Sequence, residues 1–332
     1  MKKMMKKTFS LLLLTAGCLF AACQSQTEEK GIGKSSFQYA EKEGQQLTMD
    51  VYSEAGHRQA DALRPVFIFS FGGGWETGSR RDGRRILEDF ARQGYISIGI
   101  DYRLGIRQLK EQGIAIDSTN FASSYSQAVM MGVEDLYDAT RFVIDHADEW
   151  KADTSRIIIC GSSAGATNSL TAEYLLCNSH PLATAKLPTD FNYAAVVPLA
   201  GGVWLADTDT LCWQRKPCPI LAYHGTDDQL VPFGKVVLGD GIFGGFGPDY
   251  YMPQLKQMEV SCLLHQYHRA DHLIAGCGDH ELTRAEIQRE LQHLLDTAQH
   301  VAVTISEEFY GPAPCLADLL EMAGRQAAAD NE

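Results

Sequence analysis

Short apolar runs rich in β-branched residues alternate with longer amphipathic runs along most of this 332-residue sequence. This alternation is typical of a mostly parallel sheet whose strands are joined by helices that cover both faces. With 45% hydrophobic residues the chain can bury one sizeable core, so we predict one large α/β domain over 37–300 and a C-terminal extension over 301–332. An antiparallel hairpin around Gly44 is expected to open the domain. We expect strands at 65–71, 95–102, 156–160, 193–201, 219–225 and 260–268, and helices at 84–94, 126–150, 164–177 and 282–295.

The N-terminal segment has the pattern of an export signal. Four lysines precede an apolar run of about a dozen residues, which is too short for a stable membrane-spanning helix, and small residues then lead to a cysteine. This ending resembles a bacterial lipobox, in which cleavage leaves an N-terminal cysteine that carries lipid. We therefore predict a lipoprotein signal peptide over 1–22, lipidation of Cys23, a polar tether over 23–36, and a location in the cell envelope of a bacterium. Cys18 is the alternative lipidation site, and a plain secretory peptide cut near Ala22 is the alternative interpretation.

The mature chain is strongly acidic. Removal of the leader, which carries four lysines and no acidic residue, takes the formal net charge from −13 to −17. A charge of this sign and size disfavours binding to nucleic acid or to an anionic surface through bulk electrostatics. We therefore expect no nucleic-acid partner, and contact with a membrane only through the N-terminal lipid.

The cysteine count does not decide between disulfide-bonded and unpaired cysteines. Seven cysteines remain if Cys18 is removed and Cys23 is lipidated, so at least one is unpaired within the chain. Cys212 and Cys218 flank the segment "WQRKP" and are the pair best placed for a local bridge in an oxidising compartment. Unpaired, ordinary cysteines are an equally good interpretation. No CxxC motif or Cys/His cluster has metal-ligand spacing, so no metal or cofactor is expected.

The sequence "GSSAG" at 161–165 directly follows a predicted buried strand and precedes a predicted helix. In this context a G-x-S-x-G pattern indicates a nucleophile on a strained turn, where the glycines let strand and helix approach closely. Ser163 is the central serine of the pattern, and Ser162 is only its neighbour. The N–H of Ala164, at the start of the helix, lies where negative charge would develop during attack.

A serine hydroxyl needs a histidine to accept its proton and a carboxylate to orient that histidine. Both partners are expected in loops after later strands. Asp228, in "HGTDDQLVP" after the strand "PILAYHG", is the predicted carboxylate, with Asp227 as the alternative. His272, in "RADHL" after the strand "VSCLLHQYH", is the predicted base, with His280 as the alternative.

A glycine-rich turn follows the first buried strand, in the stretch "FSFGGGWETGS" at 69–79. Three consecutive glycines leave backbone N–H groups unobstructed, and such a turn can direct two of them at an oxyanion. We predict that Gly73 and Gly74, together with Ala164, form an oxyanion hole.

Five stretches together resemble the carboxylesterase branch of the α/β-hydrolase family, near its hormone-sensitive-lipase-like and its feruloyl or acetyl esterase groups. They are "FGGGWETGS", "GIDYRL", "GSSAGA", "HGTDDQLVP" and "YHRADH", and the resemblance covers residues 37–298. It implies an α/β-hydrolase fold with Ser163 as nucleophile, Asp228 and His272 as its partners, and the glycine-rich turn as the oxyanion hole. Two features depart from the family pattern: Phe71 stands where many of these esterases have histidine, and the loop "HRADHL" lacks the usual glycine beside the histidine.

These motifs predict an exported, lipid-anchored serine carboxylesterase that hydrolyses short-chain or carbohydrate-linked esters of acetyl or feruloyl type through an acyl-enzyme. A serine peptidase of the same fold and a catalytically inactive glycan-binding lipoprotein are the alternatives. The irregular inserts at 105–125 and 238–253 are expected to roof the pocket. Since neither has the character of a long apolar lid, we expect a shallow, partly polar pocket that favours short acyl groups.

Overall fold

The computed structural model of this protein describes residues 31–54, 62–239, 243–296 and 300–308. The predicted signal peptide, Cys18, Cys23 and most of the predicted tether lie outside the described residues. None of the helices within the described ranges is long and apolar enough to cross a membrane.

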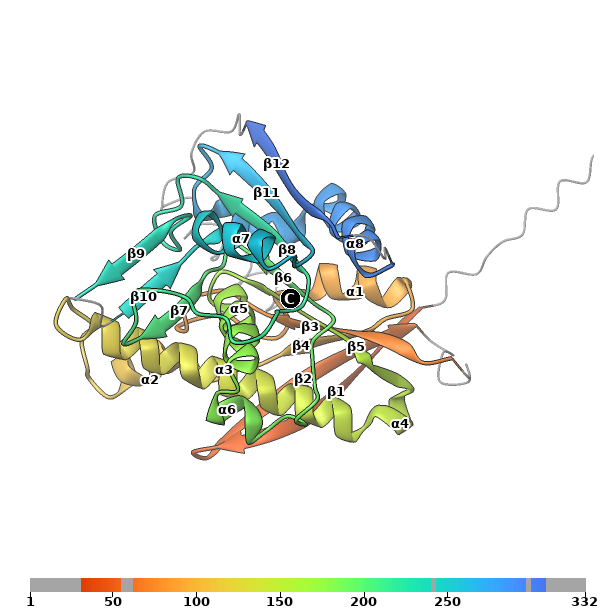
Figure 1. The fold of residues 1–332 in the computed structure, drawn as a ribbon. Coiled ribbons are helices and arrows are strands. Elements are labelled where there is room, and N and C mark those ends of the chain that lie inside the picture. The colour runs from red at the N-terminus through yellow and green to blue at the C-terminus, as the bar shows by residue number, and fades with distance from the viewer. Residues whose placement is uncertain (1–30, 55–61, 240–242, 297–299, 309–332) are drawn as a thin grey trace, which may run out of the picture. The chain divides into compact units, whose positions relative to one another are not determined.

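A nine-stranded sheet forms the centre of the described chain (Figure 1). Its strands lie in the order β1 (Ile32–Lys42), β2 (Gln45–Glu54), β4 (Ile96–Ile100), β3 (Arg64–Ser70), β5 (Ala152–Ser162), β6 (Ala195–Leu199), β8 (Ile220–Gly225), β11 (Cys262–His268) and β12 (Ala302–Glu308). β1 and β2 form the predicted antiparallel hairpin, and β2 is also antiparallel to β4. Every further pair, from β4 to β12, is parallel. The predicted mostly parallel sheet is therefore confirmed.

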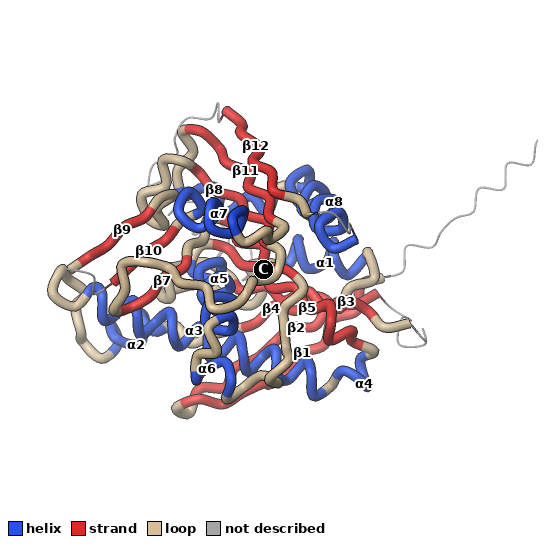
Figure 2. Tube along the Cα trace, viewed as in Figure 1, coloured by secondary structure: helices blue, strands red, loops and turns tan. Residues whose placement is uncertain are grey.

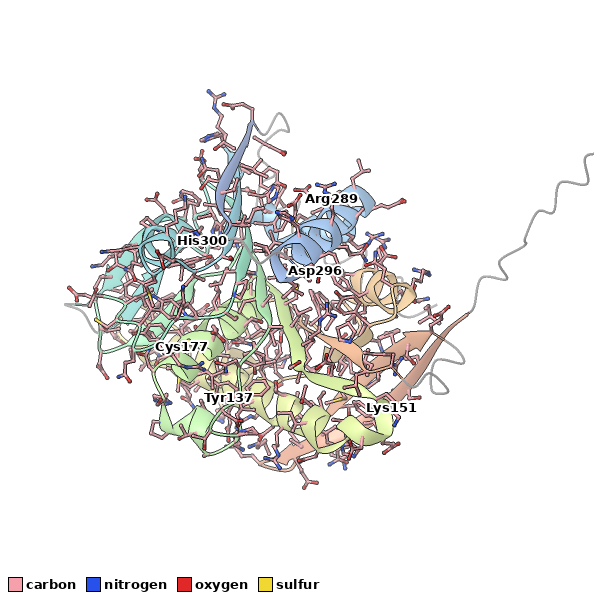
Figure 3. The ribbon with its side chains drawn as sticks, turned by 45° about the vertical axis from the view of Figure 1, so that its right-hand side comes forward. Tyr137, Lys151, Cys177, Arg289, Asp296 and His300 are labelled. Carbon is pink, nitrogen blue, oxygen red and sulfur yellow. The ribbon has the colours of Figure 1, made fainter. Side chains whose placement is uncertain are left out.

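Helices cover both faces of this sheet (Figure 2). α3 (Phe121–Asp145) and α5 (Ala164–Cys177) lie on one face, and α1 (Arg84–Arg92) and α8 (Glu281–Asp296) lie on the other. Figure 3 marks the two faces by Tyr137 on α3 and by Arg289 and Asp296 on α8. α5 is buried along its whole length, because it lies between the sheet and α3. Four shorter helices of the described chain are α2 (Gly105–Glu111), α4 (Ala147–Trp150), α6 (Pro181–Thr184) and α7 (Pro248–Gln257).

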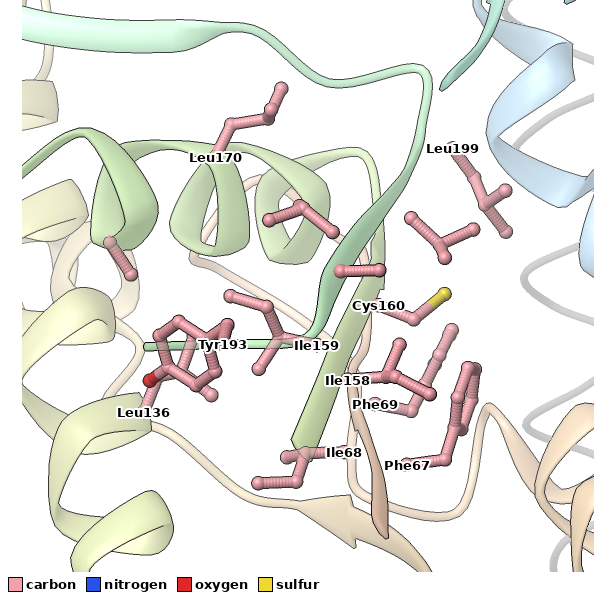
Figure 4. Packing of buried hydrophobic residues seen from close by; sticks show 14 of the residues in the cluster. Phe67, Ile68, Phe69, Leu136, Ile158, Ile159, Cys160, Leu170, Tyr193 and Leu199 are labelled. Atoms are coloured by element: carbon pink, nitrogen blue, oxygen red, sulfur yellow. The ribbon is translucent and has the colours of Figure 1, made fainter. Parts of the chain in front are cut away.

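Successive residues of the central strands project to opposite faces (Figure 4). On β5, Ile159 points toward α3 and α5, whereas Ile158 and Cys160 point to the other side. All three side chains are fully buried. A strand covered on both faces needs a continuous apolar run, which is what "RIIIC" supplies, and each buried isoleucine stabilises the fold by roughly 1.5–3 kcal/mol.

The two inserts expected to be irregular contain regular structure. The first begins with α2, and the long helix α3 starts at Phe121 rather than at 126. The second contributes to a three-stranded antiparallel sheet of β7 (Val203–Ala206), β10 (Phe243–Phe246) and β9 (Lys235–Leu238). Aromatic packing stabilises this small sheet, because the rings of Trp204 on β7 and Phe243 on β10 lie with their centroids 5.5 Å apart.

The central sheet extends beyond the predicted domain limits at both ends. β1 begins at Ile32 rather than at 37, and β12 pairs in parallel with β11 beyond residue 300. These are the two edge strands, and most of their residues are exposed or half-buried. An edge strand therefore lacks the apolar run that marks an interior strand, and the sequence pattern places its limits poorly.

Of the two interpretations left open for Cys212 and Cys218, the structure has the unpaired one, and every cysteine in the described ranges is free. Backbone hydrogen bonds to α5 hold this segment instead. The N–H of Cys218 donates to Glu173 Oε1 at 2.9 Å, and the N–H of Cys212 donates to Tyr174 Oη at 3.2 Å.

Candidate active site

Ser163 occupies a strained turn between β5 and α5. Its backbone has φ 50° and ψ −116°, a conformation that non-glycine residues rarely adopt. The flanking glycines make the turn feasible: a Cβ on Gly165 would lie 2.0 Å from the carbonyl oxygen of Ser70, and one on Gly161 would lie 2.3 Å from the backbone of Gly165. The N–H of Ser163 donates to Leu199 O at 2.8 Å, which ties the turn to β6. The local sequence thus presents the serine at the carboxyl end of the sheet.

The structure brings the three predicted triad side chains together. Asp228 follows β8, and His272 begins a short 3₁₀ segment, His272–Asp279, after β11. Ser163 Oγ and His272 Nε2 are 2.7 Å apart, and His272 Nδ1 is 2.7 Å from Asp228 Oδ2. The Asp228 and His272 residues are both buried. This geometry allows Nε2 to accept the serine proton while Nδ1–H donates to the carboxylate.

Backbone groups fix the carboxylate of Asp228. Its Oδ1 accepts the N–H groups of Leu230 at 2.9 Å and Val231 at 2.8 Å, so Oδ2 faces His272. The alternatives are placed differently. Asp227 is exposed and accepts a hydrogen bond from Thr226 Oγ1, and His280 is exposed at the start of α8.

His224 is a neighbour of the triad that the sequence analysis missed. It is buried on β8, its Nε2–H donates to Val231 O at 2.8 Å, and Nε2 lies 3.4 Å from Asp228 Oδ2. Burial lowers the pKa of His224 to about 4, against a smaller opposing effect of the Asp228 charge. The His224 ring is therefore neutral at neutral pH and does not neutralise the Asp228 carboxylate. The charge of that carboxylate acts on His272. Its position in "AYHG" just before the acidic loop was the available signal, but the chain order expected of a triad favours histidines beyond Asp228.

The glycine-rich turn lies against the serine. A Cβ on Gly72 would be 3.3 Å from Ser163 Cβ. Gly73 and Gly74 have φ of +105° and +62°, and no hydrogen bond to another described residue uses their N–H groups. Ala164 is the first residue of α5, where helix N–H groups lack an intrahelical acceptor. The three predicted oxyanion donors thus lie on the two segments that meet at Ser163.

Aromatic residues support this turn on both sides. Trp75 Nε1–H donates to Asn168 Oδ1 at 2.9 Å, and both residues are buried. Phe71 stacks on Tyr102 with ring centroids 4.3 Å apart, and Tyr102 Oη donates to Phe71 O at 2.8 Å. The phenylalanine that replaces the family's usual histidine is therefore held by Tyr102.

Solved structures of a thermophilic esterase, Est2 of the planctomycete Thermogutta terrifontis, are similar to this chain. The native Est2 structure has a TM-score of 0.59 and 21% sequence identity, covering 80% of this chain and 93% of Est2. The propionate-bound and butyrate-bound structures have TM-scores of 0.58 and 0.55, identities of 20% and 19%, and cover 80% of this chain and 95% of Est2. The chain has the α/β-hydrolase fold. The fold implied by the sequence motifs is thereby confirmed.

A family model extends the comparison to sequence. The BD-FAE family model matches residues 105–210 of this chain, a stretch that contains Ser163 but ends before Asp228 and His272. No curated protein sequence matches it. The family match is thus confined to the part of the chain around Ser163, and the fold is shared with the esterase structures above.

A cavity of about 570 Å³ adjoins the turn at Ser163. Its walls come from the glycine-rich turn and the loop that continues to Ile86, from Ser162 and Leu199, and from the segment after His272. No described residue of either predicted roof insert lines this cavity. Their aromatic rings pack on one another and on Trp75 instead, in an aromatic cluster of Phe121, Tyr125, Trp204, Phe243 and Trp75.

Proposed function

We propose that this α/β-hydrolase is a serine carboxylesterase that acts on short-chain or carbohydrate-linked esters, of acetyl or feruloyl type, through an acyl-enzyme. One observation carries the proposal: the continuous Ser163–His272–Asp228 arrangement, with two contacts of 2.7 Å, lies beside a turn with available N–H groups. A nucleophile, a base and an oriented carboxylate are the parts that acyl transfer requires.

In the proposed reaction, Ser163 Oγ attacks the ester carbonyl carbon while His272 Nε2 accepts the hydroxyl proton. The N–H groups of Gly73, Gly74 and Ala164 donate to the oxyanion of the tetrahedral intermediate. His272 then passes its proton to the leaving alcohol oxygen, and the Asp228 carboxylate stabilises the imidazolium until that transfer. Water, activated by the same histidine, hydrolyses the acyl-enzyme and regenerates the serine.

Short acyl groups are favoured by two observations. Among the described residues, Trp204 and Tyr125 pack against Trp75 beside the glycine-rich turn, and this close packing disfavours a long acyl chain there. Est2, which shares the fold, has been solved with propionate and with butyrate bound. An added methylene gains affinity, roughly 0.8 kcal/mol, only where an apolar pocket receives it.

A chain-length profile tests this function. We expect the highest kcat/KM on acetyl or butyryl 4-nitrophenyl esters and a steep fall beyond about eight acyl carbons. Feruloyl esters and aminoacyl nitroanilides complete the series. A rate that still rises at palmitoyl esters would identify a lipase, and preferential cleavage of the anilides would identify a peptidase.

We also propose that the mature protein is anchored in a bacterial cell envelope by lipid on Cys23. The support is the lipobox-like sequence before Cys23 and the polar segment that follows it.

A further inference from the structure

The 570 Å³ cavity reaches the neighbours of the reacting serine along three chain segments. Gly72 lies against Ser163, since a Cβ on Gly72 would be only 3.3 Å from Ser163 Cβ. Ser162 precedes the serine, and its Oγ donates a 2.7 Å hydrogen bond to the carbonyl oxygen of Ala275. Gly72, Ser162 and Ala275 all line the cavity, whereas the described residues Ser163 and His272 do not. The cavity therefore borders residues that adjoin Ser163 in sequence or in space.

The walls of the cavity bear on which half of an ester it receives. His272 must give its proton to the leaving oxygen, so the alcohol departs on the side of His272. The segment that begins with His272 forms one wall of the cavity, through Ala275, Gly276, Gly278 and Asp279. Trp75, by contrast, packs against Trp204 and Tyr125, with ring centroids 5.5 and 5.9 Å away. The open space therefore borders the segment that follows His272, whereas the space beside Trp75 holds packed aromatic rings.

The walls have a defined chemistry. Phe69 and Leu199 project to the same side of the sheet as Cys160 (Figure 4), and Phe71 and Ile86 complete an apolar surface. A volume of about 570 Å³ falls within the range of pockets that enclose ring-sized ligands. An alcohol with a ring would therefore gain binding affinity by burying apolar surface here, and methanol would gain little affinity.

The Asp279 carboxylate adds negative charge to these walls. Its Oδ1 lies 3.8 Å from Arg85 Nη1 in a largely exposed pair. Such an exposed pair is weak, and no lysine or arginine of the described chain lines the cavity. An anionic ligand would therefore be repelled, and a cation attracted.

We infer that this cavity binds the alcohol half of the ester and selects a ring-sized, uncharged or cationic alcohol over an anionic one. Gly276 sets the size limit and Asp279 contributes to the charge preference. The inference rests on the proposed esterase function and names the leaving group of that reaction.

Gly276→Leu tests the size limit. A Cβ on Gly276 meets no atom within 4 Å, and the residue is outside the left-handed region, so the backbone accepts a side chain. We expect kcat/KM for 1-naphthyl acetate to fall about tenfold or more, with methyl acetate changed by less than about twofold, because only the large alcohol fills the cavity. Both esters form the same acetyl-enzyme, so the acyl half is constant.

Gly234→Leu is the matched control, since a Cβ there also meets no atom within 4 Å and the residue does not line the cavity. It should leave both acetates unchanged. Equal losses on the two acetates in Gly276→Leu, or no loss on either, would overturn the inference while wild-type turnover still supports the esterase. Failure of wild-type protein to hydrolyse any ester or to react with a fluorophosphonate would instead reject the proposed function.

Asp279→Asn tests the charge preference with three aryl acetates. At low salt we expect kcat/KM to rise about fivefold for anionic 4-carboxyphenyl acetate, to fall similarly for cationic 4-(trimethylammonio)phenyl acetate, and to stay constant for phenyl acetate. Asp145→Asn, in the exposed pair with Arg141, is the control and should change none of them. Equal responses of the anionic and cationic esters to Asp279→Asn would contradict a role of its charge.

Discussion

At the residue scale, two adjacent serines have different surroundings. Ser163 Oγ meets His272, whereas Ser162 Oγ donates to the carbonyl oxygen of Ala275. Ser163→Ala should therefore lower kcat by about four orders of magnitude or more with the fold intact, as removal of a triad nucleophile does. Ser162→Ala should cost far less. Ester hydrolysis and circular dichroism of both variants provide the check, and equal losses would contradict the assignment of Ser163.

His224 makes stability depend on pH. Its folded pKa of about 4 is below the ordinary 6.5, so between these values the unfolded chain binds a proton that the folded chain does not. The contribution to stability is complete above pH 6.5 and is lost as the pH falls toward 4. At pH 5 the loss amounts to about 2 kcal/mol.

Urea unfolding at pH 7 and pH 5 measures this effect. His224→Gln should lose less stability between the two pH values than wild type does, because glutamine does not titrate. His293→Gln, on the exposed side of α8, is the control and should behave as wild type. If His224→Gln and wild type lose the same free energy of unfolding, His224 is not the group responsible.

At the scale of elements, one hydrogen bond joins the glycine-rich turn to α5. Trp75 donates to Asn168 Oδ1, and Trp75→Phe keeps the ring but leaves that buried oxygen without its donor. We expect kcat to fall about tenfold with little change in KM, because a less well-held turn stabilises the oxyanion less. Binding of a trifluoromethyl ketone inhibitor should weaken in parallel.

Trp213→Phe is the matched control, since Trp213 Nε1–H donates to Gln254 Oε1 at 3.1 Å away from the turn. It should leave kcat unchanged. A rise in KM alone in Trp75→Phe would indicate a role in substrate binding rather than in positioning the turn.

Elements with strong local patterns were predicted well. The interior strands and α5 follow from continuous apolar runs and from the glycines at their ends, and the motifs at these strand ends placed Ser163, Asp228 and His272 close together in space. The small sheet of β7, β9 and β10 was not predicted. One reason is that β7 pairs with a strand far along the chain, and another is that a glycine-rich stretch such as "FGGF" carries no register signal. The cavity was missed because its walls come from distant segments.

At the scale of the whole molecule, the proposed lipid anchor on Cys23 concerns where the protein acts. Cys23→Ser should move the protein from the membrane fraction to the soluble fraction, because lipid attachment needs the thiol. Immunoblots of the two fractions and labelling with radioactive palmitate measure the outcome. Label that persists on Cys23→Ser would identify Cys18 as the lipidated residue, and a wild-type protein without label would support a plain secretory peptide.

The two segments that carry the site differ in how readily they unfold locally. These segments are α5, which follows Ser163, and the segment that begins at His272. Every residue of α5 is buried, whereas the segment His272–Asp279 is a 3₁₀ segment with exposed and half-buried residues. Amides of a fully packed helix exchange with deuterium only on global unfolding, and weaker segments exchange through smaller openings. In moderate urea, the amides of residues 272–279 should therefore exchange before those of residues 168–177, so the proposed base would leave while the helix after Ser163 is still folded. Mass spectrometry of these two peptides measures it, and equal exchange rates would show that the site opens as one unit.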